Sequence, residues 1–250
     1  MISTHILSQP DLVDLDLKRK LSNLYQDAGI PVNYHFKNLE TDWSRNYSPS
    51  GTLTGTAKKR SQDVYNFING YITALDSIVA GQGLKVKLKN SVKIITDLIL
   101  DGSKSSGKTL LMSLIAQEAI NRGHSVKYVE WAEYCDRFLT FEARGANEDF
   151  FSDCLYCDIL IFDNLYQYEV SNNKFFIVQL DRLISSRMNK GKVTICSIDT
   201  INNQNPAFGF IWNKFSRETF TFKLPEANIK NENKSKRSWT KNFEVYFHLW

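Results

Sequence analysis

The eight residues GSKSSGKT, at positions 102–109, match the phosphate-loop pattern G-x-x-x-x-G-K-[S/T] in full. Glycines let successive backbone N–H groups surround phosphate oxygens, and a helix that begins directly after the loop adds the positive end of its dipole. We expect Lys108 to contact the β- and γ-phosphates of ATP and the Thr109 hydroxyl to ligate Mg²⁺. The predicted nucleotide-binding residues are Gly102, Ser103, Lys104, Ser105, Ser106, Gly107, Lys108 and Thr109.

A second acidic group is needed to hold the metal, and the apolar run DILIFD (158–163) ends on one, Asp163. Ligands bind at the carboxyl ends of the strands in parallel sheets, so Asp163 is predicted to hold Mg²⁺ directly or through water. The next residue is Asn164, where many such ATPases have Glu or Asp. Asparagine can orient a water molecule but cannot accept its proton. Either hydrolysis is slow or another carboxylate is the base, with Asp199 and Glu169 as candidates.

From about residue 92 onward, apolar runs alternate with segments of helical periodicity. The predicted strands are 92–101, 125–131, 158–163, 192–198 and 218–224, and the predicted helices between them are 108–122, 132–144 and 172–188. Such alternation implies right-handed crossovers between parallel strands. We therefore expect an α/β fold with a five-stranded parallel sheet flanked by helices.

The N-terminal third of the sequence lacks this alternation of strands and helices. Residues 11–25 have apolar side chains at helical spacing, so this segment is predicted to be a helix that either packs on its own domain or detaches to dock on a partner. Residues 44–62 are polar and rich in Ser, Gly and Thr, which favours a linker. We divide the chain into an N-terminal helical extension (1–45), a linker (46–62), an ATPase core (63–228) and a basic, aromatic C-terminal segment (229–250).

Composition sets broad limits on function. The 250 residues have a formal net charge of +4, which permits nucleic acid as a partner without requiring it. No apolar stretch approaches the roughly 20 residues that span a bilayer, and the N-terminus lacks the features of a signal peptide. We expect a cytoplasmic protein with no membrane partner. Cys154 and Cys157 form a CxxC pair without further metal ligands at suitable spacing, so we interpret them as structural or incidental thiols.

Four segments together resemble one family. GIPVNYHFKNLETDW (29–43), the phosphate loop, GHSVKYVEWAEYCDRFL (123–139) and FSRETFTFKL (215–224) are similar to parts of the bacterial DnaC/DnaI-type helicase loaders and the related IstB transposition helpers. These proteins are AAA+ ATPases, so the resemblance implies the AAA+ form of the P-loop fold. Only a short segment follows the last predicted strand, which implies little or no helical lid.

The resemblance also implies roles for further residues. Ser197 lies where the family has a polar sensor of the nucleotide, although the family's asparagine is missing beside it. Arg217, in the sequence FSR, lies where these proteins have an arginine finger that enters the neighbouring subunit's site, and Arg187 is a second candidate trans-acting arginine. An arginine finger cannot serve its own subunit from there, so a homo-oligomer in the ATP state is implied.

Basic and aromatic residues near the C-terminus suggest contact with single-stranded DNA. Lysine and arginine side chains would contact phosphates and an indole would stack on a base. The predicted contacts are Lys230, Lys234, Lys236, Arg237 and Trp239. Two alternatives stay open: Arg237 senses the γ-phosphate, or the whole segment is a solvated tail.

The function that best fits these features is an ATP-dependent loader that delivers a hexameric replicative helicase to single-stranded DNA in DNA replication. A transposition helper would have the same core and a different client. A nucleotide-gated adaptor would bind ATP and hydrolyse it negligibly. A metabolic P-loop kinase would need a lid for its acceptor substrate, and the sequence has no arginine-rich insertion of that kind.

Overall fold

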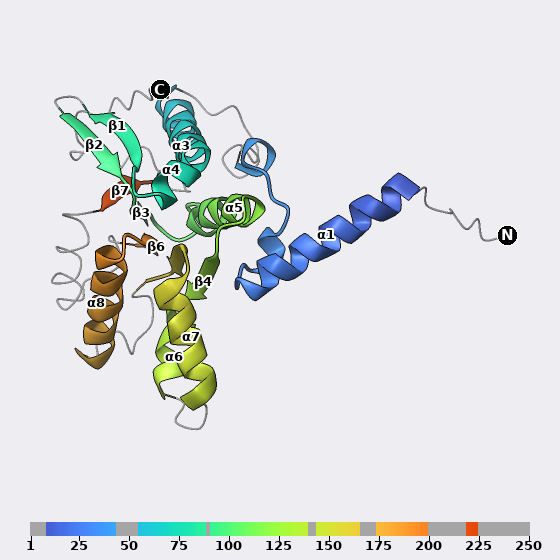
Figure 1. Cartoon of the computed structure of the whole chain (residues 1–250). Coiled ribbons are helices and arrows are strands. Elements are labelled where there is room, and N and C mark those ends of the chain that lie inside the picture. The colour runs from blue at the N-terminus through green and yellow to red at the C-terminus, as the bar shows by residue number, and fades with distance from the viewer. Residues whose placement is uncertain are drawn as a thin grey trace.

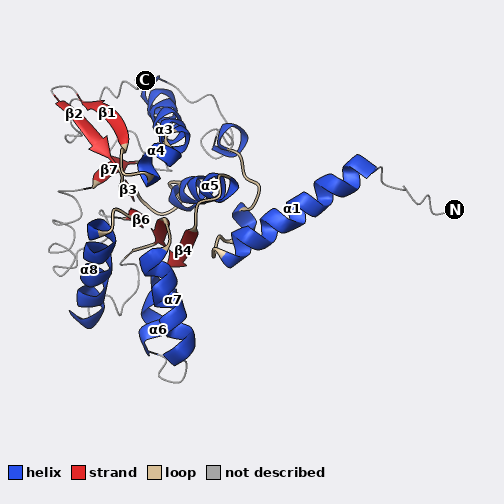
Figure 2. Cartoon of the chain, viewed as in Figure 1, coloured by secondary structure: helices blue, strands red, loops and turns tan. Residues whose placement is uncertain are grey.

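The computed structural model describes residues 9–43, 55–88, 91–139, 144–165, 174–199 and 219–224. Its centre is a five-stranded sheet in the order β4-β5-β6-β3-β7, and every neighbouring pair of strands is parallel (Figures 1 and 2). The strands are β3 (Leu98–Asp101), β4 (Val126–Glu130), β5 (Ile159–Asp163), β6 (Val193–Ile198) and β7 (Phe220–Lys223). The predicted five-stranded parallel sheet is confirmed.

Helices cover both faces of this sheet, which explains why its strands are apolar at nearly every position. On β5, Ile159 and Ile161 belong to one hydrophobic cluster, whereas Leu160 and Phe162 belong to another. The first cluster contains residues of α5 (Lys108–Asn121) and α3 (Gly55–Thr73). The second contains residues of α6 (Trp131–Leu139), α7 (Arg144–Tyr156) and α8 (Lys174–Asn189). The two clusters therefore hold the sheet from opposite sides.

The first helix, α1 (Gln9–Asp27), extends away from the body of the molecule (Figure 1). Its last turns pack on the core through Tyr25, whereas residues 14–20 are all exposed, including Leu15 and Leu17. The backbone N–H of Tyr128, on edge strand β4, donates to Ala28 O at 2.7 Å. The C-terminal end of α1 is thus attached to the domain, and its N-terminal half presents apolar side chains to solvent.

The linker prediction was wrong for residues 55–62, because α3 already begins at Gly55. The buried side of this helix starts at Val64 and Phe67, so its first turns are polar and look like linker in the sequence. Ser61 in these turns accepts a hydrogen bond at Oγ from the Trp43 indole N–H at 3.1 Å. Residues 44–54 lie outside the described residues.

The predicted strand 92–101 is in fact two strands. Residues 91–95 form β2 (Ser91–Ile95), which pairs antiparallel with β1 (Leu84–Leu88), and β3 starts only at Leu98. The break falls at Asp97, whose buried carboxylate accepts the backbone N–H of Thr194 at 2.6 Å. The predicted helix 132–144 ends earlier than expected, at Leu139. A separate helix, α7, begins at Arg144, and sequence periodicity did not predict it.

Short elements complete the described chain: η1 (Val32–Tyr34), η2 (Leu39–Trp43) and α4 (Leu75–Val79). No helix within the described residues has the length and apolarity needed to cross a membrane. The predicted absence of a lid concerns residues 225–250, which the structure does not describe.

Candidate nucleotide-binding site

The phosphate loop links β3 to α5 in a shape that needs its glycines. Gly107 has φ +90° and directly precedes α5, and a Cβ at this position would lie 2.8 Å from Cζ3 of Trp43. A Cβ on Gly102 would lie 2.6 Å from Ser106 Oγ. L-residues with a side chain rarely adopt the backbone of Gly107, and neither site has room for one. The predicted turn from strand to helix is therefore present.

Lys108 is enclosed by this loop. Its Nζ donates hydrogen bonds to the carbonyl oxygens of Gly102 at 2.6 Å and Ser103 at 2.8 Å, and the residue is 5% exposed. Burial lowers the pKa of Lys108, and this effect outweighs the opposing effect of nearby carboxylates, Asp199 first among them. A buried cation beside the first turn of a helix fits an anionic phosphate group.

Asp163 lies at the centre of the site. Its Oδ2 accepts hydrogen bonds from Thr109 Oγ1 and from the Tyr128 hydroxyl, both at 2.8 Å. Its Oδ1 accepts from Ser197 Oγ at 2.5 Å and from the backbone N–H of Asn164 at 2.9 Å. Thr109 and Asp163 thus place a hydroxyl and a carboxylate side by side, and oxygen ligands of this kind suit Mg²⁺. The residues present fit a magnesium nucleotide.

The structure brings together most of the predicted site and adds a residue that the sequence did not indicate. Tyr128 is 3% exposed, and burial, together with the charge of Asp163, raises the pKa of its hydroxyl well above the usual value. The hydroxyl therefore stays protonated and donates to Asp163. In the sequence Tyr128 looks like an ordinary strand residue, so no pattern could have identified it.

Asn164 has a left-handed backbone, with φ +53°. Its backbone N–H also donates to Ser197 Oγ at 2.8 Å, so the predicted polar sensor supports both Asp163 and Asn164. The side-chain amide of Asn164 donates to Glu130 Oε1 at 3.3 Å. Of the two carboxylates predicted as alternative bases, Asp199 is 6% exposed and lies near Lys108, and Glu169 lies outside the described residues.

The segment that contains η1 and η2 packs along α5. Gln117 of α5 binds this segment, since its Nε2 donates to Tyr34 O at 2.8 Å and its Oε1 accepts the backbone N–H of Phe36 at 2.6 Å. Farther along, the ring of Trp43 lies over Gly107. Gln117 is a buried polar residue that directly follows the apolar run 114–116 of α5, and this position is the sequence signal that could have identified it.

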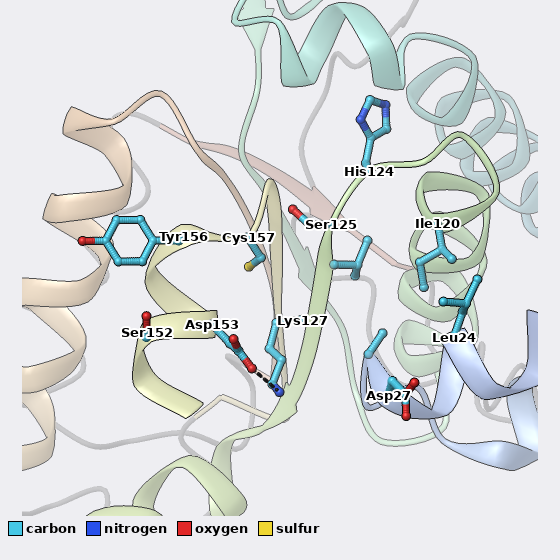
Figure 3. Close-up of a pocket in the computed structure, with 12 residues that line it drawn as sticks. Leu24, Asp27, Ile120, His124, Ser125, Lys127, Ser152, Asp153, Tyr156 and Cys157 are labelled. Atoms are coloured by element: carbon cyan, nitrogen blue, oxygen red, sulfur yellow. Dashed lines mark hydrogen bonds and ion pairs between the residues drawn. The ribbon is translucent and has the colours of Figure 1, made fainter. Parts of the chain in front are cut away.

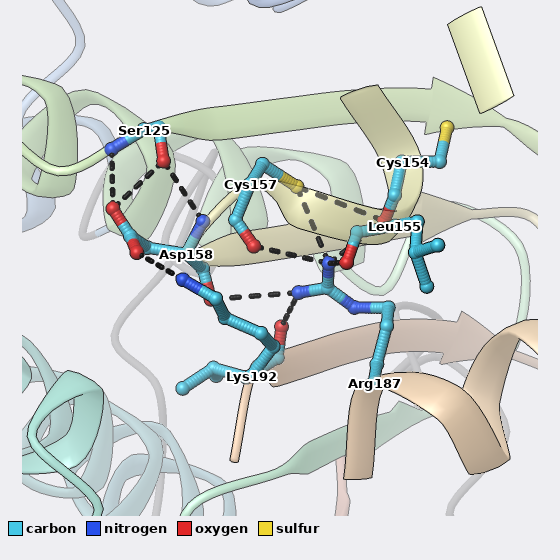
Figure 4. Close-up of polar contacts among 8 residues, drawn as sticks. Ser125, Cys154, Leu155, Cys157, Asp158, Arg187 and Lys192 are labelled. Carbon is cyan, nitrogen blue, oxygen red and sulfur yellow. Dashed lines mark hydrogen bonds and ion pairs between the residues drawn. The ribbon is translucent and has the colours of Figure 1, made fainter. Parts of the chain in front are cut away.

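Arg187 requires a correction. It is 0% exposed, and carbonyl oxygens of the chain itself surround its guanidinium (Figure 4). Its donors reach the backbone oxygens of Cys154 at 2.7 Å and Cys157 at 3.0 Å, and the side-chain oxygen of Thr194 at 3.1 Å. A guanidinium held in this way cannot enter a neighbouring subunit. Arg187 instead joins the C-terminal ends of α7 and α8 to the start of β6.

The CxxC pair is part of the hydrogen-bonded cluster around Arg187. Cys154 and Cys157 are buried free thiols, and their backbone carbonyls accept from Arg187. Burial raises the pKa of Cys154 to about 12 and also raises that of Cys157, so neither is a thiolate at neutral pH. This agrees with structural thiols.

The remaining predicted residues lie outside the described part of the chain. They are Arg217 and the C-terminal residues Lys230, Lys234, Lys236, Arg237 and Trp239.

A cavity of about 490 Å³ lies elsewhere, at the amino end of β4 between α1, α5 and α7 (Figure 3). Leu24 and Tyr156 line it, and Lys127 forms an ion pair with Asp153 at 3.1 Å within it. None of its lining residues belongs to the phosphate loop or contacts Asp163.

Comparison with known proteins identifies this arrangement. A family model described as "IstB-like ATP binding protein" matches residues 86–210, which is half of the chain and includes the phosphate loop, Asp163 and Ser197. No curated protein sequence matches. A crystal structure of the DnaC helicase loader aligns with a TM-score of 0.53 at 14% identity, over 77% of this chain and 99% of the loader.

Structures of the replication initiator DnaA also align. One is from Aquifex aeolicus with AMPPCP bound, at a TM-score of 0.52 and 14% identity, over 76% of this chain and 51% of that one. Another holds AMPPCP and single-stranded DNA, at a TM-score of 0.53, 14% identity and the same coverage. The chain thus spans about half the length of these DnaA structures. At such identities the likeness establishes the fold alone, and it confirms the predicted AAA+ form.

Proposed function

Since the chain belongs to the family of IstB-like ATP-binding proteins, we propose that it is an ATPase that delivers a hexameric replicative helicase to single-stranded DNA. The main support for ATPase activity is the contact between Thr109 and Asp163 beside the buried Lys108. This contact brings the expected phosphate and metal ligands together in one place. The likeness to the DnaC helicase loader supports the loader part.

In this function the phosphate loop binds the nucleotide. The ammonium of Lys108 would exchange its bonds to the Gly102 and Ser103 carbonyls for phosphate oxygens, and Thr109 and Asp163 would hold Mg²⁺. The ion supplies positive charge that stabilises the transferring phosphoryl group. Ser197 and Tyr128 fix the orientation of Asp163 through hydrogen bonds, so the carboxylate already faces the Thr109 hydroxyl.

The exposed half of α1 is the proposed contact for the helicase. Leu15 is 50% exposed and Leu17 55%, on a helix that extends from the body (Figure 1). Exposed leucines on a projecting helix suit a protein partner that covers them. Residues 1–45 would thus bind the client, while the core, from α3 to β7, binds the nucleotide.

Described residues also support a DNA partner. Residues 84–95, which include the paired strands β1 and β2, contain four lysines and no acidic residue. Lys85 and Lys87 are exposed on one side of β1, opposite Ile94 and Val92 of β2. Side chains at alternate positions of a strand lie on one face, so both lysines would be available to phosphates of one DNA strand. The C-terminal basic residues would extend this contact.

Arg217 is the proposed arginine finger. It follows from the resemblance to helicase loaders and requires a homo-oligomer in the ATP state, in which each subunit completes its neighbour's site. The buried position of Arg187 leaves Arg217 as the one arginine proposed for this role.

A transposition helper is the second candidate, because the matching family model is the IstB-like one. Its nucleotide site would be the same and its client would be a transposase. A third possibility is an adaptor that binds ATP with negligible turnover.

Capture from host lysate distinguishes these candidates. The tagged full-length chain is incubated with and without ATP and Mg²⁺, and the retained proteins are identified by mass spectrometry. The expected result is a hexameric replicative helicase, captured with ATP and lost in Lys108→Ala and in Leu15→Glu/Leu17→Glu. Capture of a transposase instead would establish the helper, and capture of neither would contradict both.

A further inference from the structure

The residue after Asp163 leaves the hydrolytic reaction without an obvious base. Asn164 has an amide, which accepts no proton at neutral pH, whereas attack of water on a phosphoryl group releases a proton. A carboxylate must therefore lie near Asn164 if the chain hydrolyses ATP by general base catalysis. Asp163 itself is unsuitable, because its buried carboxylate is the proposed ligand of Mg²⁺.

Three other carboxylates of the described chain lie around the site. Asp101 and Asp199 are 4% and 6% exposed, and both lie close enough to the Lys108 ammonium to favour its charged form. Glu130, in contrast, is exposed to solvent. Of these three groups, Glu130 alone combines access to water with a hydrogen bond to the Asn164 amide.

The backbone places Glu130 beside Asp163. It is the last residue of β4, and in the parallel pairing of β4 with β5 its register partner is Asp163. Both carboxylates therefore lie at the carboxyl edge of the sheet, where ligands bind in folds of this kind. Sequence spacing could not reveal this, because Glu130 and Asp163 come from different strands.

Asn164 orients the carboxylate. Its backbone N–H is held by Asp163 Oδ1 and Ser197 Oγ, and its φ of +53° directs the side-chain amide to Glu130 Oε1 at 3.3 Å. Asparagine is among the few residues with a side chain that tolerate this backbone conformation. The amide thus fixes one oxygen of Glu130 and leaves the other free to accept a proton.

We propose that Glu130 is the general base for ATP hydrolysis and that Asn164 is the residue that positions it. In the step, the oxygen of a water molecule forms a bond to the γ-phosphorus and its proton passes to the Glu130 carboxylate. The bond between the γ-phosphorus and the β–γ bridging oxygen breaks, and its electron pair leaves with ADP. Inorganic phosphate is the second product, and Glu130 returns the proton to solvent. The inference rests on the ATPase activity proposed above.

The first test compares Glu130→Gln with the wild-type chain in the presence of single-stranded DNA. The variant is expected to keep its ATP affinity and melting temperature and to lose at least about 100-fold in turnover, the lower end of general-base contributions. Glu133→Gln is the matched control, because Glu133 is an exposed glutamate three residues away that pairs with Arg137 at 3.1 Å. The control is expected to turn over ATP at the wild-type rate.

A further readout separates a base from a structural partner. The double variant Glu130→Asn/Asn164→Asp places a carboxylate directly after β5, on a residue type that tolerates the left-handed backbone, and is expected to recover at least about 10-fold over Glu130→Gln. A purely structural contact would give no such recovery.

Two outcomes would overturn the inference. If the wild-type chain hydrolyses ATP and Glu130→Gln does so at the same rate, the base is elsewhere and the proposed ATPase stands. If the wild-type chain binds ATP and shows no turnover with DNA present, both the base and the ATPase are contradicted and the adaptor is supported.

Discussion

The Thr109 hydroxyl, in the first turn of α5, donates a hydrogen bond to the Asp163 carboxylate at the end of β5 at 2.8 Å. The two residues come from the two sequence segments that were predicted separately to bind Mg²⁺. Their contact turns two motifs into one site, because a single ion can reach both oxygens only if the strand and the helix meet in this way.

Asp163→Asn is expected to weaken ATP binding in the presence of Mg²⁺ by about 100-fold, because loss of groups around a bound metal costs up to about this factor. Binding without Mg²⁺ should change little, since Lys108 and the loop remain. Titration of ATP with and without Mg²⁺ measures both. Equal affinity of wild type and variant in Mg²⁺ would contradict the role of Asp163.

Arg187→Lys is expected to lower the free energy of unfolding by about 3 kcal/mol, because a lysine cannot reproduce the fork of donors and a buried charge is left poorly paired. Urea unfolding measures this loss. ATP turnover per folded molecule should stay at the wild-type value. A stable variant without turnover would instead restore Arg187 as a functional arginine.

Asp158 predicts a pH dependence of stability. Burial raises the pKa of Asp158, but Lys192 and Ser125 donate to its carboxylate at 2.7 Å, and together these contacts lower the pKa to about 2 from the usual 3.8 (Figure 4). The folded pKa is lowered, so this stabilisation is present above pH 3.8 and is lost as pH falls through about 2. Asp158→Asn should flatten the unfolding free energy over this window. An unchanged pH profile in the variant would contradict the prediction.

Lys85→Ala/Lys87→Ala is expected to weaken binding to single-stranded DNA several-fold. The slope of log affinity against log salt is expected to fall by about 1.4, or about 0.7 for each phosphate that a lysine no longer neutralises. Fluorescence anisotropy with a labelled oligonucleotide at several salt concentrations measures both. Lys18→Ala/Lys20→Ala is the matched control, because these exposed lysines pair with Asp14 and Asp16 on α1. The same weakening in both double variants would show a general charge effect only.

The parts of the site that depend on local patterns could be predicted from the sequence. The phosphate loop needs glycines at fixed spacing, and Asp163 ends an apolar strand, so both could be recognised before the fold was known. The surroundings of Asp163 could not, because Tyr128, which donates to it, and Glu130, its register partner, both lie on a neighbouring strand. Strand pairing at long range leaves no trace in residue spacing.

The errors in the predicted elements also come from contacts between residues that are distant in the sequence. Polar first turns of α3 resemble a linker when the residues that bury the helix lie farther along the chain. The strand 92–101 breaks at Asp97, whose carboxylate accepts the backbone N–H of Thr194 on β6, a residue 97 positions away. Arg187 was expected to act on a neighbouring subunit, whereas its guanidinium is enclosed by carbonyls from α7 and β6.

Calorimetric titration of ATP and Mg²⁺ into the full-length chain is the decisive test of the nucleotide site. We predict saturable binding at one site per chain, and no measurable binding to Lys108→Ala at the same concentrations. The melting temperature of Lys108→Ala is measured alongside, to show that the variant is folded. Absence of binding to the wild-type chain, or equal binding to the folded variant, would contradict a nucleotide site at residues 102–109.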